Sequence, residues 1–297
     1  MKTSKDVGVF MKVQANESIL RIKSPSKKEF SEIAKQYQPF IIEDVANHWD
    51  ACQQWSNDYL IEKCGNNLVP VRFYKKDFWN DYQNFAYERS YEPHKEIKLQ
   101  DYINNDRTLE CYLNEAILEE RFPELVGDVV YPQYFNRKSF VRLWFGLASK
   151  NFTSNSSLHF DAEHNLFAQI RGRKRILLYP PIDYLSFYPP LEDATGALYG
   201  SKVNPDAVDL ELFPKFPWQE KIEFVLQPGE ILYLPPFWWH HVTAVDDNIS
   251  LSFWYGVKIA DFFWQKKMLS VFFHTAPHYL YHSIFAGNFS FWNLFKL

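Results

Sequence analysis

One short segment of the chain combines the residue types with which non-heme iron oxygenases bind their metal. His159 and Asp161 lie two residues apart in LHFDAEH, and in a β-strand their side chains would project from the same face. A pair of histidines, His240 and His241, follows in LYLPPFWWHHV. Two histidines and one carboxylate on one side of an ion, with the remaining positions open, form the facial arrangement of Fe(II) oxygenases. The spacing therefore predicts metal-dependent oxidation, although His-x-Asp tripeptides also occur as plain hydrogen-bonded pairs beneath a sheet.

A lysine near this segment favours the metal hypothesis. If residues 167–170 and 174–179 form a hairpin across an Arg-Gly-Arg turn, then Lys174, Ile176 and Leu178 share the inward face. A lysine on an apolar face is costly unless an anion meets it, and an anionic co-substrate of the metal would be such a partner. In a shifted register, Lys174 would instead be solvated. Periodicity does not decide which histidine of the 240–241 pair faces the metal.

Composition limits the classes of function. The chain has 297 residues, 19% of them aromatic, and a net charge of −4, which gives no electrostatic signal for nucleic acid or an anionic membrane. Cys52, Cys64 and Cys111 form a sparse, odd set without a CxxC pair, as is typical of a reducing compartment. The N-terminus lacks an apolar signal segment, and no run reaches the length of a membrane span. We therefore expect a cytoplasmic protein.

The first hundred residues show helix and strand signals in alternation. Ser26 with Glu29 forms a capping-box pattern before a helix within 26–37, and Ser56 precedes a second helix that stops at Gly65. We expect β-structure in PFIIED and NLVPVRFY, a loop over residues 74–98 and a short helix over residues 99–105.

From about residue 109 the pattern changes to short extended segments separated by turns such as Gln-Pro-Gly. Many short strands at this spacing predict a closed or double-sheet β architecture, with a jelly roll as the natural candidate. We divide the chain into an N-terminal α/β extension (1–108), a β core (109–257) and an aromatic helical segment (258–297). The expected strands are LECYL, FVRLWFGL, SLHFD, NLFAQI, KRILLYP, KIEFVL, EILYLP, HHVTAV and ISLSFWY.

These motifs resemble the JmjC, or cupin-like, oxygenases that depend on Fe(II) and 2-oxoglutarate. The matching segments are HFDAEHNLFAQIRGRKRILLYPP, LQPGEILYLPPFWWHHV and SLSFWYG, and PFIIEDVANHWDACQQWSNDYLIEKCG is similar to the family's N-terminal module. The likeness spans roughly residues 38–257 and is nearest to the asparaginyl hydroxylase of the hypoxia-inducible factor. It implies a double-stranded β-helix with flanking helices.

The resemblance also implies roles for individual residues. It makes His159, Asp161 and His240 the iron ligands and Lys174 the partner of the distal carboxylate of 2-oxoglutarate. In place of an asparagine expected before Trp254, the chain has Ser252. Residues implied to contact the co-substrate are Tyr112, Ser156 (or its neighbours Ser157 or Thr153), Asn165 and Trp254.

By the same resemblance, the cofactors are Fe(II), 2-oxoglutarate and O₂, and the reaction is hydroxylation of a C–H bond, or demethylation through hydroxylation. A protein or peptide side chain is the leading substrate. A modified tRNA base or a small molecule is the alternative within the same chemistry. A cupin-type binding protein without catalysis is the alternative outside it.

The segment 258–297 is rich in phenylalanine, tyrosine and tryptophan but has few lysines. Membrane attachment would normally bring a basic polar face, so we expect a homodimer through C-terminal helices instead. His274, His278 and His282 have the spacing of one helical stripe, which Pro277 interrupts. We favour an interface over a second metal site there.

Overall fold

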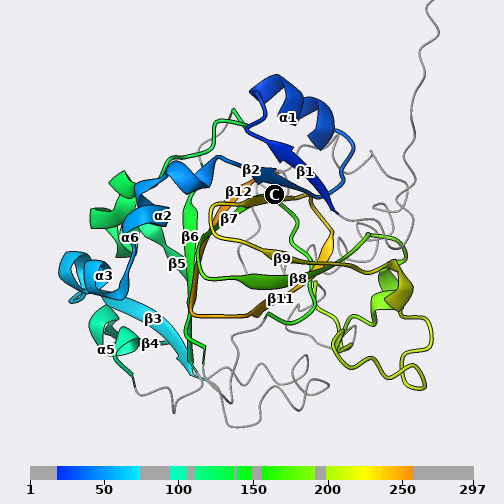
Figure 1. Cartoon of the computed structure of the whole chain (residues 1–297). Helices are drawn as coiled ribbons and strands as arrows, with labels where there is room; N and C mark the ends of the chain where they lie inside the picture. Colours follow the sequence, from blue (N-terminus) through cyan, green and yellow to red (C-terminus); the bar gives the residue numbers. More distant parts are fainter. Residues whose placement is uncertain are drawn as a thin grey trace, which may run out of the picture.

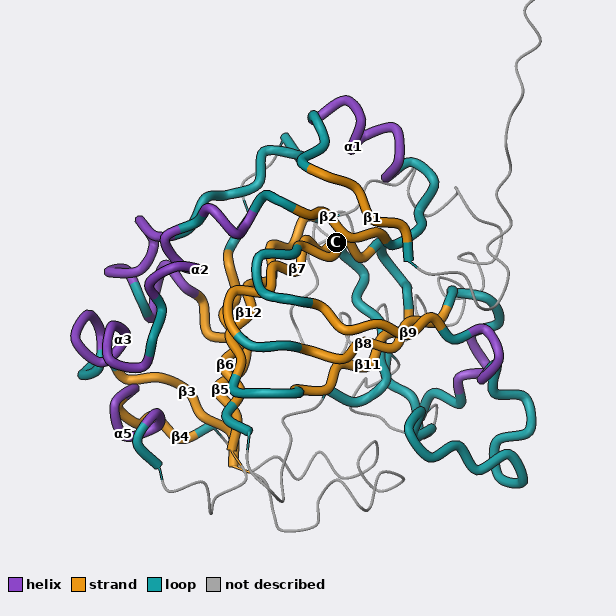
Figure 2. The backbone as a smooth tube through the Cα atoms, in the orientation of Figure 1, coloured by secondary structure: helices purple, strands orange, loops and turns teal. Residues whose placement is uncertain are grey.

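The computed structural model describes residues 19–73, 94–105, 111–136, 139–148, 156–190 and 199–256. The chain is mainly β with few helices (Figures 1 and 2). Its strands are β1 Leu20–Lys23, β2 Phe40–Glu43, β3 Leu68–Phe73, β4 Lys95–Lys98, β5 Cys111–Ile117, β6 Val141–Gly146, β7 His164–Arg171, β8 Lys174–Tyr179, β9 Ile222–Leu226, β10 Ile231–Leu234, β11 Trp239–Ala244 and β12 Asn248–Tyr255. Its α-helices are α1 Lys27–Ala34, α2 Asp50–Gln54, α3 Asn57–Cys64, α5 Leu99–Ile103 and α6 Leu118–Arg121, and its 3-10 turns are Ala46–His48, Pro123–Asp128, Tyr184–Phe187 and Trp218–Glu220.

The strands form two sheets. The large sheet has nine strands in the order β1-β2-β10-β7-β12-β6-β5-β3-β4, and the small sheet has three in the order β11-β8-β9. Side chains from both sheets line one cavity, so the sheets face each other across it. The predicted double-sheet, jelly-roll or cupin-type architecture is confirmed at this level. The predicted C-terminal helices and the domain boundaries at 108 and 257 fall on residues outside the described ranges.

Alternation along β7 shows how the large sheet separates two environments. Leu166, Ala168 and Ile170 belong to a core that also contains Phe30 of α1 and Leu60 of α3, so this face packs against the helices. Phe167, on the opposite face, packs with residues of β8 and β10 between the sheets. Since successive side chains of a strand alternate between faces, one face stabilises the fold and the other borders the cavity.

The predicted helix starts are confirmed in detail. The Ser26 hydroxyl accepts from the Glu29 amide at 3.3 Å, and the Glu29 carboxylate accepts from the Ser26 amide at 2.8 Å, which satisfies two donors that a helix N-terminus leaves open. The Ser56 hydroxyl accepts from the Tyr59 amide in the same way, and α3 ends at Gly65. These caps are local, which is why the sequence alone predicts them.

Two predicted extended or loop segments need correction. Part of the expected loop 74–98 is strand β4, since Lys95–Lys98 pairs antiparallel with β3, and residues 74–93 lie outside the described ranges. The expected strand SLHFD is instead an irregular segment in which only His159 forms isolated bridges, to Gly200 and to His240. Its backbone is satisfied by loop and strand partners rather than by a regular ladder.

The predicted hairpin of 167–170 with 174–179 is wrong. β7 pairs with β10 and β12, whereas β8 pairs with β11 and β9 in the other sheet. The Arg-Gly-Arg turn is therefore a corner between sheets. Gly172 has φ +64°, and a Cβ there would lie 2.0 Å from the Asp247 carbonyl oxygen, so the corner requires glycine.

Two simpler expectations concern cysteines and membrane spans. None of Cys52, Cys64 and Cys111 forms a disulfide among the described residues. Among the residues that the structure describes, no helix has the length and apolar character needed to cross a bilayer.

Candidate metal centre and co-substrate pocket

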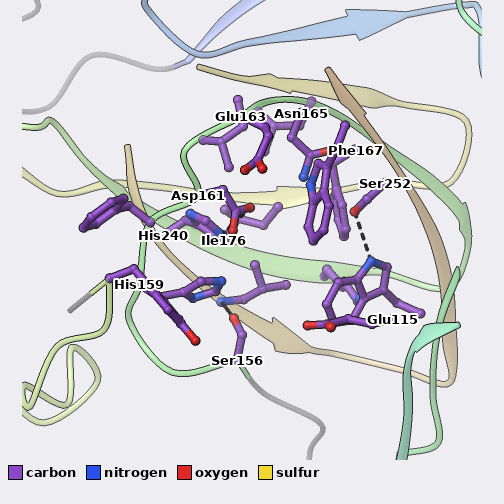
Figure 3. Close-up of a pocket in the computed structure, with 18 of the residues that line it drawn as sticks. Glu115, Ser156, His159, Asp161, Glu163, Asn165, Phe167, Ile176, His240 and Ser252 are labelled. Atoms are coloured by element: carbon purple, nitrogen blue, oxygen red, sulfur yellow. Dashed lines mark hydrogen bonds and ion pairs between the residues drawn. The ribbon is translucent and has the colours of Figure 1, made fainter. Parts of the chain in front are cut away.

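The predicted triad comes together in space. Ligand atoms of His159, Asp161 and His240 all lie within 4.8 Å of one another. His240 Nε2 and Asp161 Oδ2 are 3.8 Å apart, which is too far for a hydrogen bond. Figure 3 shows the three side chains converging at one end of the pocket. The His240 and Asp161 side chains are therefore close without a hydrogen bond between them.

Main-chain carbonyls fix the orientation of both imidazoles. His159 Nδ1 donates to the Ser157 carbonyl at 2.7 Å, and His240 Nδ1 donates to the Trp238 carbonyl at 3.0 Å. With the proton on Nδ1, the Nε2 lone pair of each ring is available. This is the outer hydrogen bond by which metal-binding histidines are held in the required tautomer.

Strand β11 resolves the choice between the paired histidines. His240 lines the pocket, whereas His241 faces the opposite side, where its Nε2 lies 3.1 Å from Asp206 Oδ2. The alternation of a strand allows only one of two neighbours to reach the cavity, so His240 is the triad member.

Burial shifts the pKa values of two members of the triad. Burial raises the pKa of Asp161, and the nearby His159 and Arg142 only partly oppose that shift. Burial, followed by the neighbouring His159, lowers the pKa of His240 well below its usual value. Neutral imidazole is the metal-binding form, and a divalent cation would stabilise the buried carboxylate. The three residues therefore fit Fe(II).

The triad opens into a cavity of about 320 Å³ between the two sheets, within the range of small-molecule sites. Lys174 lies in this cavity and is only 1% exposed. Its Nζ contacts the Tyr112 hydroxyl at 3.4 Å and the Phe167 ring at 5.1 Å from the centroid. No carboxylate of the described residues pairs with it, and burial lowers its pKa to about 7. The cavity thus holds a buried amine that an anion would complement.

The other residues implied by the resemblance also line this cavity. Tyr112, Asn165 and Trp254 do so, and the Asn165 Oδ1 and Trp254 Nε1 atoms are buried without hydrogen-bond partners among the described residues. Ser156 lines it too, with its hydroxyl accepting from the Val242 amide at 3.1 Å. Ser157 supplies only the carbonyl that binds His159, and Thr153 lies outside the described ranges.

Ser252 has a role that the sequence did not predict. Its hydroxyl accepts from Trp144 Nε1 at 3.0 Å, and the Trp144 ring lies 6.2 Å from the Tyr112 ring. The serine therefore holds an indole as one wall of the cavity (Figure 3). Trp144 could have been found from the alternation in VRLWFG, where it shares a face with Arg142.

Two glutamates of the cavity were also missed. Glu163 follows Asp161 by two residues, and Glu115 lies in β5 at a bulge between Leu113 and Ala116, with φ +59°. The period-two spacing after Asp161 could have identified Glu163. Nothing in the sequence indicates the bulge that places Glu115.

His164 is neither a substrate contact nor a loop residue. It begins β7, is 8% exposed, and its Nδ1 lies 3.0 Å from the Tyr233 hydroxyl. It packs on the helix-covered side with Tyr37 and Phe135. Strand β7 starts one residue earlier than the segment NLFAQI suggests, which places His164 in the strand and not in the preceding loop.

Comparison with known families decides the relationship. The profile of the cupin-like domain matches residues 26–261. The chain belongs to the cupin-like family. The predicted JmjC or cupin-like class is thereby confirmed, and the triad of His159, Asp161 and His240 fits the binding of iron.

The names of individual relatives indicate different functions. Jumonji C domain-containing protein 5 of Drosophila melanogaster is 27% identical over 82% of this chain and 61% of its own length. Lysine-specific demethylase JMJ30 of Arabidopsis thaliana is 31% identical over 73% of this chain and 50% of its own length. tRNA wybutosine-synthesizing protein 5 of Mus musculus is 27% identical over 79% of this chain and 76% of its own length. The chain thus spans 61% and 50% of the length of the first two relatives, and a special likeness to the asparaginyl hydroxylase is not shown.

Proposed function

We propose that this protein is an Fe(II)- and 2-oxoglutarate-dependent dioxygenase that hydroxylates a C–H bond of a protein or peptide side chain. The observation that carries the proposal is the joint presence, in one cavity, of an uncompensated His-Asp-His triad and a buried lysine without a carboxylate partner. A binding protein without catalysis would not need both groups. Either one left unoccupied would only destabilise the fold.

The roles of the side chains follow from their positions. His159, Asp161 and His240 would hold the metal through the two Nε2 atoms and one carboxylate oxygen. Lys174 and the Tyr112 hydroxyl would bind the far carboxylate of 2-oxoglutarate, since they lie together on the inter-sheet side of the cavity. Residues proposed to complete the co-substrate site are Ser156, Asn165 and Trp254.

When bound, Fe(II) with 2-oxoglutarate would activate O₂, so that one oxygen atom enters a C–H bond of the substrate and the other enters succinate as 2-oxoglutarate is oxidised and loses CO₂. The chain's own contribution is to orient the ligands and exclude water. The Ser157 and Trp238 carbonyls keep both imidazoles in the binding tautomer. Apolar side chains such as Phe167, Ile176 and Leu232 surround the amine and limit its hydration.

Motifs, relatives and net charge bear on the substrate class. The motifs that resemble the asparaginyl hydroxylase favour a protein side chain, and relatives named as lysine-specific demethylases are compatible with demethylation through hydroxylation. A modified tRNA base is the second candidate, because the chain spans 76% of a tRNA wybutosine-synthesizing protein. The net charge of −4 favours the protein substrate.

Two measurements test the proposal: conversion of 2-oxoglutarate to succinate without an added substrate, and binding of the co-substrate. Purified full-length protein with Fe(II), ascorbate and 2-oxoglutarate should release succinate, and His159→Ala should not. A screen of peptides and tRNA for a mass gain of one oxygen then separates the two substrate classes. Failure of the wild-type protein to bind Fe(II) or 2-oxoglutarate would support the non-catalytic alternative.

We also propose a homodimer through residues 258–297, on the basis of their aromatic composition. Light scattering on the full chain and on a chain that ends at residue 257 measures the mass of each. If both chains have the mass of a monomer, the proposed dimer is contradicted.

A further inference from the structure

We propose that Glu163, with Glu115 on the opposite wall, makes the substrate end of the cavity selective for a cationic target group, either a guanidinium or an ammonium. This inference rests on the proposed oxygenase function and narrows its substrate class. The two glutamates belong to neither the triad nor the proposed co-substrate site, and Asn165 of that site would contribute only its amide oxygen.

Glu163 lies in the bend that connects Asp161 to β7. Asp161, Glu163, Asn165 and Phe167 all line the cavity, whereas His164 packs on the other side. Glu163 therefore lies between the proposed metal ligand Asp161 and the lining residues Asn165 and Phe167 in the sequence of the cavity wall. Figure 3 shows its carboxylate directed into the pocket beside Asp161.

Glu115 approaches from β5. Its backbone has φ +59° at the β-bulge, a conformation that L-residues other than Asn and Asp seldom adopt and that bulges use to redirect a side chain. The side chain is 45% exposed, which places it on the solvent side of the cavity it lines. Figure 3 shows its carboxylate directed into the pocket on the side away from Glu163.

The charges of the metal, the co-substrate and the surrounding side chains do not cancel, because one carboxylate of the described residues lacks a counter-charge. Bound Fe(II) and 2-oxoglutarate carry equal and opposite charges, and Lys174 balances Asp161. Arg142 is the remaining cation near the cavity in the described part of the chain. Its Nη1 lies 4.0 Å from Glu115 Oε2, and its positive charge also acts on Asp161 and Glu163. The two glutamates therefore share one arginine, and one negative charge remains without a counter-charge. A cationic target group would supply it, whereas a neutral amide would not and a carboxylate would add repulsion.

An unpartnered amide points to a ligand independently of the acids. Asn165 is 4% exposed, and its Oδ1 is a buried acceptor that no donor of the described residues reaches. The carboxylates of 2-oxoglutarate cannot donate to it at neutral pH. A group with several N–H donors, such as a guanidinium, can bond an amide oxygen and a carboxylate together. Asn165 and Glu163 are neighbours on the same face and offer that pair of acceptors.

The test uses Mn(II) in place of iron, so that no turnover is needed. Full-length protein is loaded with Mn(II) and 2-oxoglutarate, and the paramagnetic relaxation of the protons of n-butylguanidinium, n-butylammonium and pentanamide is measured by titration. We expect the better of the two cationic probes to bind at least about tenfold more tightly than pentanamide, a difference that corresponds to one well-placed charge pair. Glu163→Gln should remove most of this preference, and Glu115→Gln should reduce it less.

Two further variants serve as controls. Glu120→Gln makes the same charge change at an exposed residue of α6 outside the cavity and should leave the preference unchanged. Arg142→Gln should increase it, because it frees Glu115. Mn(II) affinity is measured for every variant, so that loss of the metal is not mistaken for loss of selectivity.

The outcomes are separable. If 2-oxoglutarate does not bind the Mn(II)-loaded wild type, the proposed function fails. If 2-oxoglutarate binds but pentanamide binds as tightly as the cations, or the cations show no relaxation, only the present inference fails. An unchanged preference in Glu163→Gln with normal Mn(II) affinity would also overturn it.

Discussion

The two faces of strands β8 and β11 carry similar basic residues. On the outer face these residues pair with carboxylates, and on the inner face they do not within the described ranges. On the outer face, Arg175 bonds Asp206 and Glu223, each at 2.6 Å, and His241 bonds Asp206 at 3.1 Å. On the inner face, Lys174 and His240 belong to the same two strands. Neither of these inner side chains pairs with a carboxylate within hydrogen-bond distance among the described residues.

The difference indicates that the outer face stabilises the fold and the inner face binds ligands. The outer network satisfies its charges within the chain, and its hydrogen bonds with His241 and Arg175 lower the pKa of Asp206 far below the usual range. The inner groups stay uncompensated at a cost to stability, which is understandable if ligands complete them. The comparison predicts opposite responses of neighbouring residues to mutation.

The largest contrast should separate the two neighbouring histidines. We expect His240→Ala to weaken Fe(II) binding by more than about 100-fold, since changes to groups that merely orient a ligand already cost about 10- to 100-fold. Its stability without metal should change little. His241→Ala should keep Fe(II) binding but lose about 1–3 kcal/mol of unfolding free energy, because it leaves Asp206 without a buried partner. Metal titration and urea unfolding of both variants check this. Loss of Fe(II) binding in His241→Ala together with normal binding in His240→Ala would contradict the assignment of His240 as the metal ligand.

The next contrast pairs Lys174 with Arg175. Lys174→Met should weaken 2-oxoglutarate binding strongly and stabilise the ligand-free protein by about 1 kcal/mol or more, because a buried unpaired charge is replaced by an apolar chain of similar size. Arg175→Met should leave 2-oxoglutarate binding unchanged and cost up to about 1 kcal/mol, since its ion pairs are partly exposed. Calorimetric titration and thermal unfolding measure both effects. A destabilised Lys174→Met would mean that the amine is already satisfied.

A pH series sharpens the same contrast. Burial lowers the pKa of Lys174 in the folded state to about 7, so between pH 7 and its unfolded value the unfolded chain binds more protons. Unfolding free energy of the ligand-free protein should then rise with pH in this window, with a slope of at most about 1.4 kcal/mol per pH unit. Lys174→Met should lack this component. Saturating 2-oxoglutarate should suppress it in the wild type, and an identical slope in both proteins would contradict the account.

The outer face predicts the reverse sign. The pKa of Asp206 is lowered in the folded state, so its stabilising effect is present above the unfolded pKa and is lost as pH falls toward the folded pKa. Asp206→Asn should cost about 1–2 kcal/mol at pH 7 and less at pH 3. Unfolding at the two pH values, with 2-oxoglutarate affinity as the control, measures this. Equal costs at both values would count against the network.

The smallest effect should come from the wall of the cavity. Ser252→Ala removes the acceptor of Trp144 Nε1, which should cost about 0.5–1.5 kcal/mol and weaken 2-oxoglutarate binding a few-fold because the indole is less well held. Ser252→Thr, which restores a hydroxyl, should recover part of the affinity. Unaltered binding in Ser252→Ala would show that packing alone positions the indole.

The sequence by itself determined the features that depend on short-range chemistry. The caps at Ser26 and Ser56, the outline of the strands and the inward face of Lys174 all follow from spacing over a few residues. The motif likeness supplied the triad. The lysine was placed correctly even though its predicted hairpin was wrong, because alternation belongs to the strand and not to its partner.

Only the tertiary structure decided which strands pair and what meets across the cavity. The Gly172 corner sends β8 into a different sheet, and long-range pairing selects His240 over His241. Glu115 reaches the pocket through a left-handed residue at a bulge, and Ser252 acquires its role from a tryptophan 108 positions away. Such contacts join residues far apart in the chain, and local periodicity carries no information about them.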